Sequence, residues 1–216
     1  GHWQSVDSGT KQRLLGVAVN NDGLAVAVGA FGTLLRSLDG GKTWISIAPD
    51  WAPYTETGER PHLYAAAVND SGKITVAGEF GLILISDDGG KSWKTVHKGD
   101  QTSPSLFAMQ LRADGIGYAV GQSGTVLRTA NHGATWDAVD SGTASALLGV
   151  YSDQDGWVVA TGMHDIVDSH DAGKTWEHAQ GKEIASKWLQ GVTSPAQGQP
   201  LLAVGESGRM VRIYGN

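Results

Sequence analysis

Short runs of apolar residues, separated by turn residues, follow one another along the whole chain. Leu24-Ala25-Val26-Ala27-Val28 is typical of a buried strand, and Gly29 ends it. A second run, Leu34-Leu35-Arg36-Ser37, follows after a short turn. Asp39-Gly40 comes next, and such a pair supplies the positive φ that a tight hairpin needs. The pattern therefore predicts an antiparallel meander of short strands.

This meander recurs along the chain. The segment that ends the first copy, 37–44, returns at 86–93, 129–136 and 169–176, so that copies follow at intervals of 40 to 49 residues. Trp3-Gln4-Ser5-Val6 matches Trp44-Ile45-Ser46-Ile47, so it ends a fifth copy whose beginning, 204–212, lies at the other terminus. Repeats of this length predict a fold built from copies of one small unit.

Each copy predicts four strands, and one column of the first strand holds only small residues: Gly16, Ala65, Ala108, Gly149 and Gly191. Four-stranded units repeated around an axis form a β-propeller, and its inner strands are crowded. We therefore predict an all-β fold, a five-bladed β-propeller of four-stranded antiparallel blades, as a single domain over residues 1–216. N- and C-terminal strands that share one blade would close the ring without a free edge. The tryptophans that mark the five blades are Trp3, Trp44, Trp93, Trp136 and Trp176.

The repeated motif Ser-x-Asp-x-Gly-x-Thr-Trp resembles the Asp-box, or bacterial neuraminidase repeat. The longer pattern that leads into the third copy, residues 119–129, is similar to the photosystem II stability/assembly factor family. This resemblance extends over all five copies. It implies an exported propeller, lumenal or periplasmic, that binds protein. The box alone also occurs in sialidases and other glycosidases, so those activities stay open at this point.

The box itself has a structural interpretation. Its acidic or amide residues are expected to accept hydrogen bonds from backbone amides of their own turn; these are Asp39, Asp88, Asn131 and Asp171. The box tryptophans are expected to pack between sheets. One carboxylate per turn is too few for calcium, which takes about six to eight oxygen ligands. We expect no metal site and no cofactor.

Three sets of residues are candidates for binding a partner. Loops between second and third strands vary on a rigid scaffold and carry Glu79, Phe80, His164 and Glu206. The long link after the first copy, 51–62, carries Trp51, Tyr54 and Arg60, residue types that are common in protein contacts, although the link could instead pack on its own blade.

The third set is an arginine column. Arg36, Arg128 and Arg212 occupy one position in three copies, where the other two copies have Ile85 and Asp168. The family resemblance implies an arginine patch that binds the tail of a membrane-protein client. Hydrogen bonding between blades is the alternative.

Composition excludes several classes of protein. The net charge of −6 and a pI near 5.6 argue against binding nucleic acid, whose phosphates require a basic surface. The absence of cysteine excludes disulfides and thiolate metal sites, and no apolar run is long enough to span a membrane. Gly1-His2 is typical of the remnant of a cleaved tag, and we expect a signal peptide to have been removed.

We predict a non-catalytic, protein-binding scaffold rather than an enzyme. A sialidase needs an arginine triad, and no arginine falls in the predicted first strands. The expected partner is a membrane protein or its exported segment, in a photosystem-type complex or a bacterial envelope exporter. The alternative is a carbohydrate-binding or glycosidase propeller, in which Glu79 and Glu206 form a carboxylate pair or Trp188 stacks on a sugar.

Overall fold

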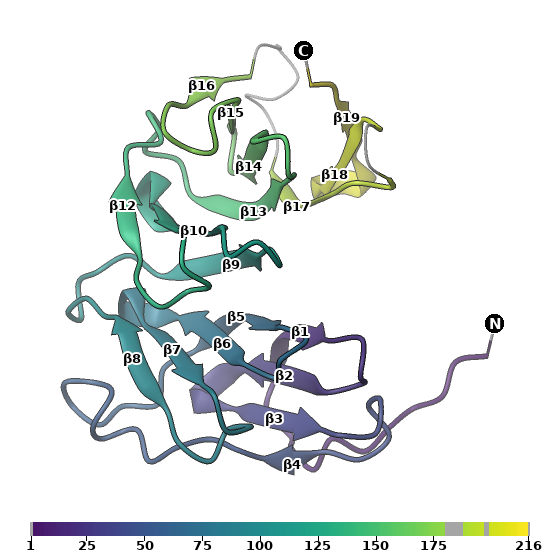
Figure 1. Ribbon diagram of the computed structural model, residues 1–216, viewed down its shortest axis with the longest axis vertical. Coiled ribbons are helices and arrows are strands. Elements are labelled where there is room, and N and C mark those ends of the chain that lie inside the picture. The colour runs from purple at the N-terminus through teal and green to yellow at the C-terminus, as the bar shows by residue number, and fades with distance from the viewer. Residues whose placement is uncertain (1, 180–187, 197–198, 216) are drawn as a thin grey trace. The chain divides into compact units, whose positions relative to one another are not determined.

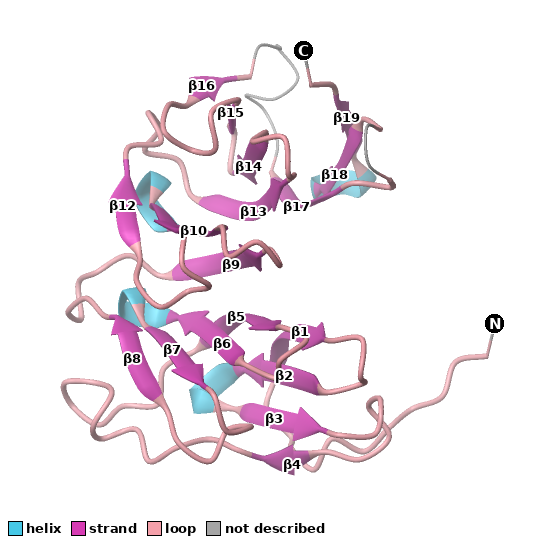
Figure 2. Ribbon diagram, in the orientation of Figure 1, coloured by secondary structure: helices cyan, strands magenta, loops and turns pink. Residues whose placement is uncertain are grey.

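The computed structural model describes residues 2–179, 188–196 and 199–215 (Figure 1). In this part of the chain all regular structure is β-strand, apart from four single-turn 3₁₀ helices (Figure 2). The chain forms two compact units, Gly1–Ser103 and Pro104–Asn216. No helix in the described residues is long and apolar enough to span a membrane.

The first unit contains two four-stranded antiparallel sheets. One runs in the order β1 (Leu14–Val19), β2 (Ala25–Gly29), β3 (Leu34–Ser37) and β4 (Ile45–Ser46). The other runs in the order β5 (Leu63–Val68), β6 (Ile74–Gly78), β7 (Ile83–Ser86) and β8 (Lys94–His97). In both sheets the order in space is the order in sequence, as a meander requires.

The second unit contains three antiparallel sheets. Two of them have four strands: β9 (Leu106–Leu111), β10 (Gly117–Gly121), β11 (Val126–Thr129) and β12 (Asp137–Val139), and then β13 (Leu147–Ser152), β14 (Val158–Gly162), β15 (Ile166–Ser169) and β16 (Glu177–His178). The third has three strands: β17 (Leu189–Thr193), β18 (Leu201–Gly205) and β19 (Met210–Ile213).

Five antiparallel sheets at the predicted spacing confirm the prediction of an all-β fold made of repeated blades. The fifth sheet has three strands in the described residues, and residues 2–13 contain no strand. Trp3, which we expect to begin a fourth strand and to pack between sheets, is fully exposed. It has no strand partner and no apolar surface against it in this structure. Closure of the ring by residues 3–6 stays a prediction.

The glycine that ends each second strand has a steric reason. In the second sheet the amide of Glu79 donates to the carbonyl oxygen of His62, which precedes the first strand, at 3.0 Å. A Cβ on Gly78 would overlap this same oxygen. The other four sheets repeat the arrangement at Gly29, Gly121, Gly162 and Gly205. The end of β2, β6, β10, β14 and β18 is therefore held tightly against the start of its neighbouring strand.

Close approach of neighbouring sheets explains two of the glycines in the column of small residues. A Cβ on Gly16 of β1 would lie 2.6 Å from the carbonyl oxygen of Tyr64 on β5, and a Cβ on Gly149 of β13 would lie 3.1 Å from that of Gln190 on β17. The second strands β2, β6, β10 and β14 are buried along their whole length. Apolar side chains of adjacent sheets thus form the core of each unit, and burying them from water stabilises it.

Candidate functional site

The turns of the Asp-boxes satisfy their own hydrogen bonds. Asp39 accepts the amides of Lys42 and Thr43 on one carboxylate oxygen, both at 2.9 Å, and the Thr43 hydroxyl on the other at 2.7 Å. Hydrogen bonds from Thr43 and Ser37 hold the pKa of Asp39 well below its usual range. The boxes of Asp88 and Asp171 repeat this pattern, and Asn131 accepts the Thr135 amide. These side chains are engaged in shaping the turn.

Four of the box tryptophans pack within or between sheets. Three of them donate from Nε1 to a glycine carbonyl of their own turn, at 3.0 to 3.2 Å; these are Trp44, Trp136 and Trp176. Trp93 donates instead to the carbonyl of Ile47 in the neighbouring sheet, at 3.3 Å. The ring of Trp176 lies edge-on to that of Tyr118, which belongs to the preceding sheet.

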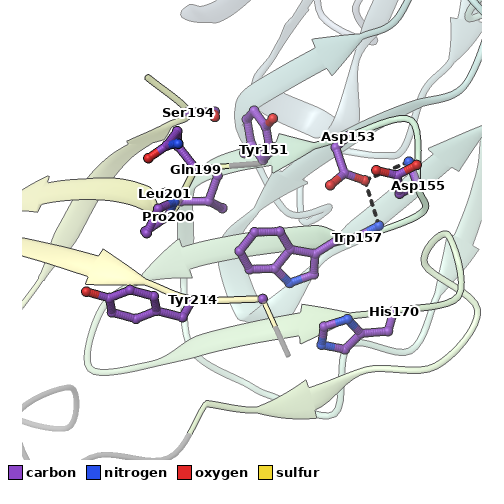
Figure 3. Close-up of a pocket in the computed structure, with 11 residues that line it drawn as sticks. Tyr151, Asp153, Asp155, Trp157, His170, Ser194, Gln199, Pro200, Leu201 and Tyr214 are labelled. Atoms are coloured by element: carbon purple, nitrogen blue, oxygen red, sulfur yellow. Dashed lines mark hydrogen bonds between the residues drawn. The ribbon is translucent and has the colours of Figure 1, made fainter. Parts of the chain in front are cut away.

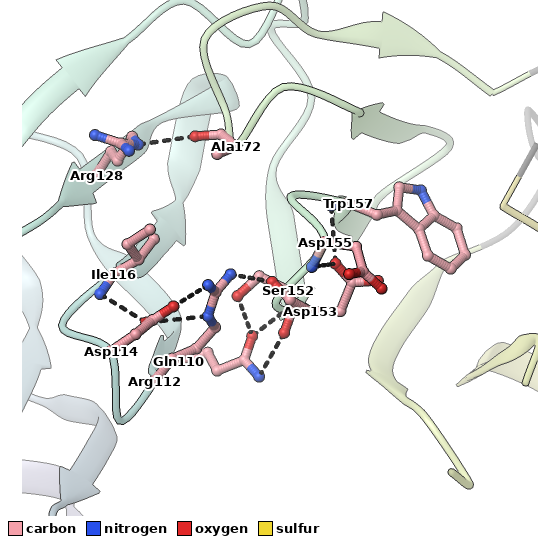
Figure 4. Close-up of polar contacts among 10 residues, drawn as sticks. All are labelled: Gln110, Arg112, Asp114, Ile116, Arg128, Ser152, Asp153, Asp155, Trp157 and Ala172. Atoms are coloured by element: carbon pink, nitrogen blue, oxygen red, sulfur yellow. Dashed lines mark hydrogen bonds and ion pairs between the residues drawn. The ribbon is translucent and has the colours of Figure 1, made fainter. Parts of the chain in front are cut away.

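The arginine column connects neighbouring sheets at two of its three positions. Nη1 of Arg36 donates to the carbonyl oxygen of Gly89 at 2.5 Å, and Nε of Arg128 donates to that of Ala172 at 2.8 Å (Figure 4). Gly89 and Ala172 occupy the same position in the box turn of the following sheet. Both arginines are half-buried, whereas Arg212 is exposed. The sequence left two interpretations open, a partner-binding patch and hydrogen bonding between blades. Arg36 and Arg128 make the hydrogen bonds of the second interpretation.

The long link 51–62 packs mainly on its own unit. Trp51 is only 4% exposed and joins the core with Val28 and Leu82. Room for its indole exists because Gly32 has no side chain; a Cβ there would overlap Nε1. The Tyr54 hydroxyl donates to the carbonyl of Trp93 at 3.1 Å. Trp51 is therefore not exposed to a partner, contrary to the first reading of this link, while Arg60 is exposed.

The turns between second and third strands present side chains from strained backbone. Each holds a non-glycine residue at positive φ: Phe31, Phe80, Ser123, His164 and Ser207. L-residues adopt this region rarely and at a cost, which marks the turn as a rigidly imposed shape. Phe31 is 57% exposed. His164 and Glu206 are exposed, and Phe80 is half-buried.

Aromatic residues gather beside one of these turns in the first unit. The rings of Phe31 and His62 lie 4.9 Å apart, and His62 stacks on Tyr64 at 6.4 Å. Glu79 accepts the His62 amide at 2.7 Å and a hydrogen bond from Tyr64. Burial, and then the charge of Glu79, raises the pKa of Tyr64. We call Phe31, His62 and Tyr64 the aromatic surface of the first unit.

The corresponding turn of the fourth sheet is one residue shorter and has Asp165 where the others have glycine. Asp165 accepts the Thr143 hydroxyl at 2.6 Å and contacts Nδ1 of His178 at 3.2 Å. Nε2 of His178 contacts the carbonyl of Gly142 at 3.1 Å. The hydrogen bond and charge of Asp165, with a smaller effect of Gly142, raise the pKa of His178. This contact holds the link between β12 and β13 to the turn.

A pocket in the second unit was missed by the sequence reasoning. It has a cavity volume of about 430 Å³ and is lined by residues of β13, the β13–β14 hairpin, the fourth box turn and the segments flanking β18 and β19. Figure 3 shows the indole of Trp157 at its centre, with Tyr151, Asp153 and Asp155 above it, Tyr214 to one side and His170 below. In the sequence, most of these residues fall at positions that vary between the copies, whereas Asp155 matches Asp22 and Asp114.

In the described part of the chain, no three His, Cys, Asp or Glu side chains gather closely enough to hold a metal ion. Glu79 and Glu206, the carboxylate pair considered for glycoside hydrolysis, lie in different units. Glu79 is already hydrogen-bonded within its own sheet.

The chain is similar to known proteins in part of its sequence and in its fold. Residues 49–130 match the family model described as photosynthesis system II assembly factor YCF48. No curated protein matches the chain. Two solved structures of YCF48 resemble it: one described as bound to D1 peptide, with a TM-score of 0.71, 19% identity and 94% of this chain covered; and one from Cyanidioschyzon merolae, with a TM-score of 0.72, 18% identity and all of this chain covered.

The chain spans 65% of the length of the first of these proteins and 71% of the second. A glycosidase, the GH74 xyloglucanase from Xanthomonas campestris, also resembles it, with a TM-score of 0.67 and 18% identity over 88% of this chain and 35% of that enzyme. Likeness at this level of identity shows the fold. The chain is thus a β-propeller with five sheets as its blades, similar in fold to YCF48 and matching the assembly-factor model over 49–130.

Proposed function

We propose that this chain is a non-catalytic scaffold that binds a protein, acting as an assembly, stability or accessory factor for a membrane complex. The observation that carries the proposal is the match of 49–130 to the assembly-factor model, joined with the fold shared with a propeller described as bound to D1 peptide. The partner is an exported segment of a membrane protein, of a photosystem-type complex or a bacterial envelope exporter. The same proposal has the chain act in the periplasm or a lumen.

The aromatic surface of the first unit is the docking site that the geometry supports best. Phe31 is 57% exposed, whereas Phe80 at the same position of the second sheet is half-buried, and backbone contacts of Gly29 and Gly32 fix the position of Phe31. The ring of Phe31 contacts that of His62, which in turn stacks on Tyr64. Rigid aromatic side chains lose little entropy when a partner covers them, and they dominate many protein interfaces.

The arginine column contributes less to this proposal than the sequence implies. Arg36 and Arg128 each use a nitrogen to bind the next sheet, so their first role is to hold blades together. Arg212 and Arg60, which are exposed, are the arginines of the candidate set that remain as contacts for an acidic partner segment.

Affinity capture from detergent-solubilised native membranes, followed by mass spectrometry, tests the proposal. The bait is the full chain beside a Phe31→Ala variant. Leu38→Ala is the matched control, because Leu38 is 67% exposed but lies in the box turn at the opposite end of the same sheet. We expect one membrane complex with the native chain and the control, and loss of that complex with Phe31→Ala. Equal recovery by both variants would move the interface elsewhere, and recovery of no membrane protein would contradict the proposal.

A further inference from the structure

The repeat supplies an internal reference for every position of the fourth sheet. In each four-stranded sheet the hairpin between the first two strands is closed by the same backbone hydrogen bond, such as Asp153 N to Trp157 O at 3.0 Å. Its counterparts are Asn20 to Leu24, Asn69 to Lys73 and Arg112 to Ile116. Residues can therefore be compared position by position between sheets.

In the preceding sheet, two residues of this hairpin bind the next sheet (Figure 4). Gln110 exchanges hydrogen bonds with the backbone of Ser152, and the guanidinium of Arg112 donates to the carbonyl oxygen of Asp153. Asn20 does the same in the first unit, where its Nδ2 donates to the carbonyl of Asn69 at 3.1 Å. A donor at this position therefore ties one sheet to the next.

The fourth sheet has Tyr151 and Asp153 at the positions of Gln110 and Arg112. A carboxylate cannot donate a hydrogen bond, so Asp153 cannot make the bond to the following sheet that Arg112 makes. The cavity of about 430 Å³ lies at this junction (Figure 3). One oxygen of Asp153 accepts hydrogen bonds from the amides of Asp155 and Trp157, both at 2.9 Å, and within the described residues its other oxygen accepts none.

Three further departures position the floor of the same pocket. Trp157 stands where the first sheet has Leu24, and His170 where it has Leu38. Asp168, in the arginine column, accepts a hydrogen bond from Nε1 of Trp157 at 3.3 Å and contacts Nε2 of His170 at 3.0 Å. The two rings consequently lie parallel within 8°, with centroids 6.2 Å apart. Tyr151, Asp153, Trp157 and His170 thus line one cavity, and Asp168 contacts two of them from behind it.

We propose that this pocket binds a neutral saccharide. A sugar ring presents apolar C–H faces and a rim of hydroxyls that both donate and accept. The rings of Tyr214 and Tyr151, beside Trp157, offer surface for the first, and the carboxylates of Asp153 and Asp155 accept from the second. The volume lies in the range of small-molecule pockets, about 300–1,000 Å³, and exceeds what one protein side chain fills.

Charge narrows the class of sugar. Asp153 and Asp155 line the cavity, and among its described lining residues there is no Lys or Arg. Sialic and uronic acids carry a carboxylate that these groups repel. This inference is independent of the protein partner proposed above, since the pocket lies at the box end of the sheets and Phe31 lies at the other end of its own sheet.

Binding of the full chain to an array of neutral and acidic oligosaccharides tests this proposal, with titration of the best neutral sugar in solution. Two variants remove an aromatic ring from the pocket: Tyr214→Ala, because Tyr214 is 66% exposed, and Trp157→Leu, which introduces the residue of the first sheet. Because Trp157 also packs against the core of the second unit, urea unfolding of Trp157→Leu checks that the fold is kept. We expect each to weaken binding about tenfold or more, which corresponds to a loss near 1.4 kcal/mol.

Asp155→Ala and Asp22→Ala form a matched pair, since both residues are exposed and occupy the same hairpin position in the fourth and first sheets. Binding should weaken with Asp155→Ala and stay unchanged with Asp22→Ala. Failure of the native chain to bind any neutral sugar would overturn the proposal. So would equal binding by all variants, or binding of lysine- and arginine-containing peptides at this pocket in place of sugars.

Discussion

Some side chains in this propeller belong to one sheet and form hydrogen bonds with the next. Arg36 lies in β3, and its guanidinium donates a hydrogen bond to the carbonyl of Gly89 in the second sheet. Arg128 does the same toward Ala172. A donor shared between sheets resists their separation, because a buried carbonyl left without a partner is costly.

Replacing Arg36 by alanine should therefore destabilise the fold. Loss of a hydrogen bond from a charged, half-buried group costs about 1.5–3 kcal/mol. Arg212→Ala is the control at the equivalent, exposed position, and it should change stability by less than about 0.5 kcal/mol. Urea unfolding at neutral pH measures both. Equal effects of the two substitutions would show that the contact to Gly89 contributes little.

His178 offers a second prediction for a single side chain. Its pKa is raised in the folded protein, chiefly by Asp165, so this contact stabilises the fold below the ordinary value near 6.5 and is lost as pH rises through the folded pKa. Titration by NMR should give His178 a midpoint above that ordinary value. In Asp165→Asn the midpoint should fall back toward it, and an unchanged midpoint would show that Asp165 is not the cause.

At the scale of elements, the box turn is a closed hydrogen-bonded unit. In the three boxes that contain aspartate, the carboxylate receives two amides and two hydroxyls from its own turn, as at Asp88. These bonds lower the pKa of Asp39, Asp88 and Asp171. A carboxylate whose pKa is lower in the folded state stabilises the fold above the pKa it has when unfolded, and the stabilisation is lost as pH falls.

Stability should consequently decline as pH falls below about 4, the ordinary value for aspartate. A triple variant with Asn at 39, 88 and 171 copies the box of Asn131, which accepts the same amide without a charge. Its urea midpoint should depend less on pH between pH 5 and 2. Some loss remains, because hydrogen bonds also lower the pKa of Asp100 and Asp114. An equally steep decline would mean that the boxes do not control acid stability.

The elements themselves were accessible from sequence, and the direction of side chains was not. Strand positions follow from apolar runs and Asp-Gly turns, which are local signals. Whether Trp51 faces a partner or the core depends on the missing Cβ of Gly32, 19 residues earlier, and no local pattern reports that. Likewise, Arg36 is a surface arginine by composition and becomes a link between sheets only because the second box turn lies beside it.

For the pocket around Trp157, the sequence shows the residue types but not that they lie together. Five positions that vary between the sheets hold, in the fourth sheet, Tyr151, Asp153, Trp157, Asp168 and His170. Their common location is not visible, because it depends on the hairpin of β13 and β14 lying beside the fourth box turn. The sequence analysis considered Asp168 only as an exception in the arginine column.

For the whole molecule, the single-domain interpretation of residues 1–216 stays a prediction that stability measurements can test. Gly78→Ala introduces a Cβ that overlaps the His62 carbonyl and should destabilise the first unit by about 3 kcal/mol or more. If the chain unfolds as one domain, hydrogen exchange of β14 amides in the second unit should quicken by the same free energy. Leu38→Ala is the control, and unchanged protection of β14 would indicate two independent domains.

The repeat also bears on how such a molecule changes over generations. Blades share one hydrogen-bonded plan, with a glycine closing the second strand in all five sheets and an internally bonded box in four. Copies three and four keep nearly the same strand register while differing at the hairpin. Duplication of a self-sufficient module therefore supplies spare copies, and one copy can diverge into a new site while its sisters continue to maintain the fold.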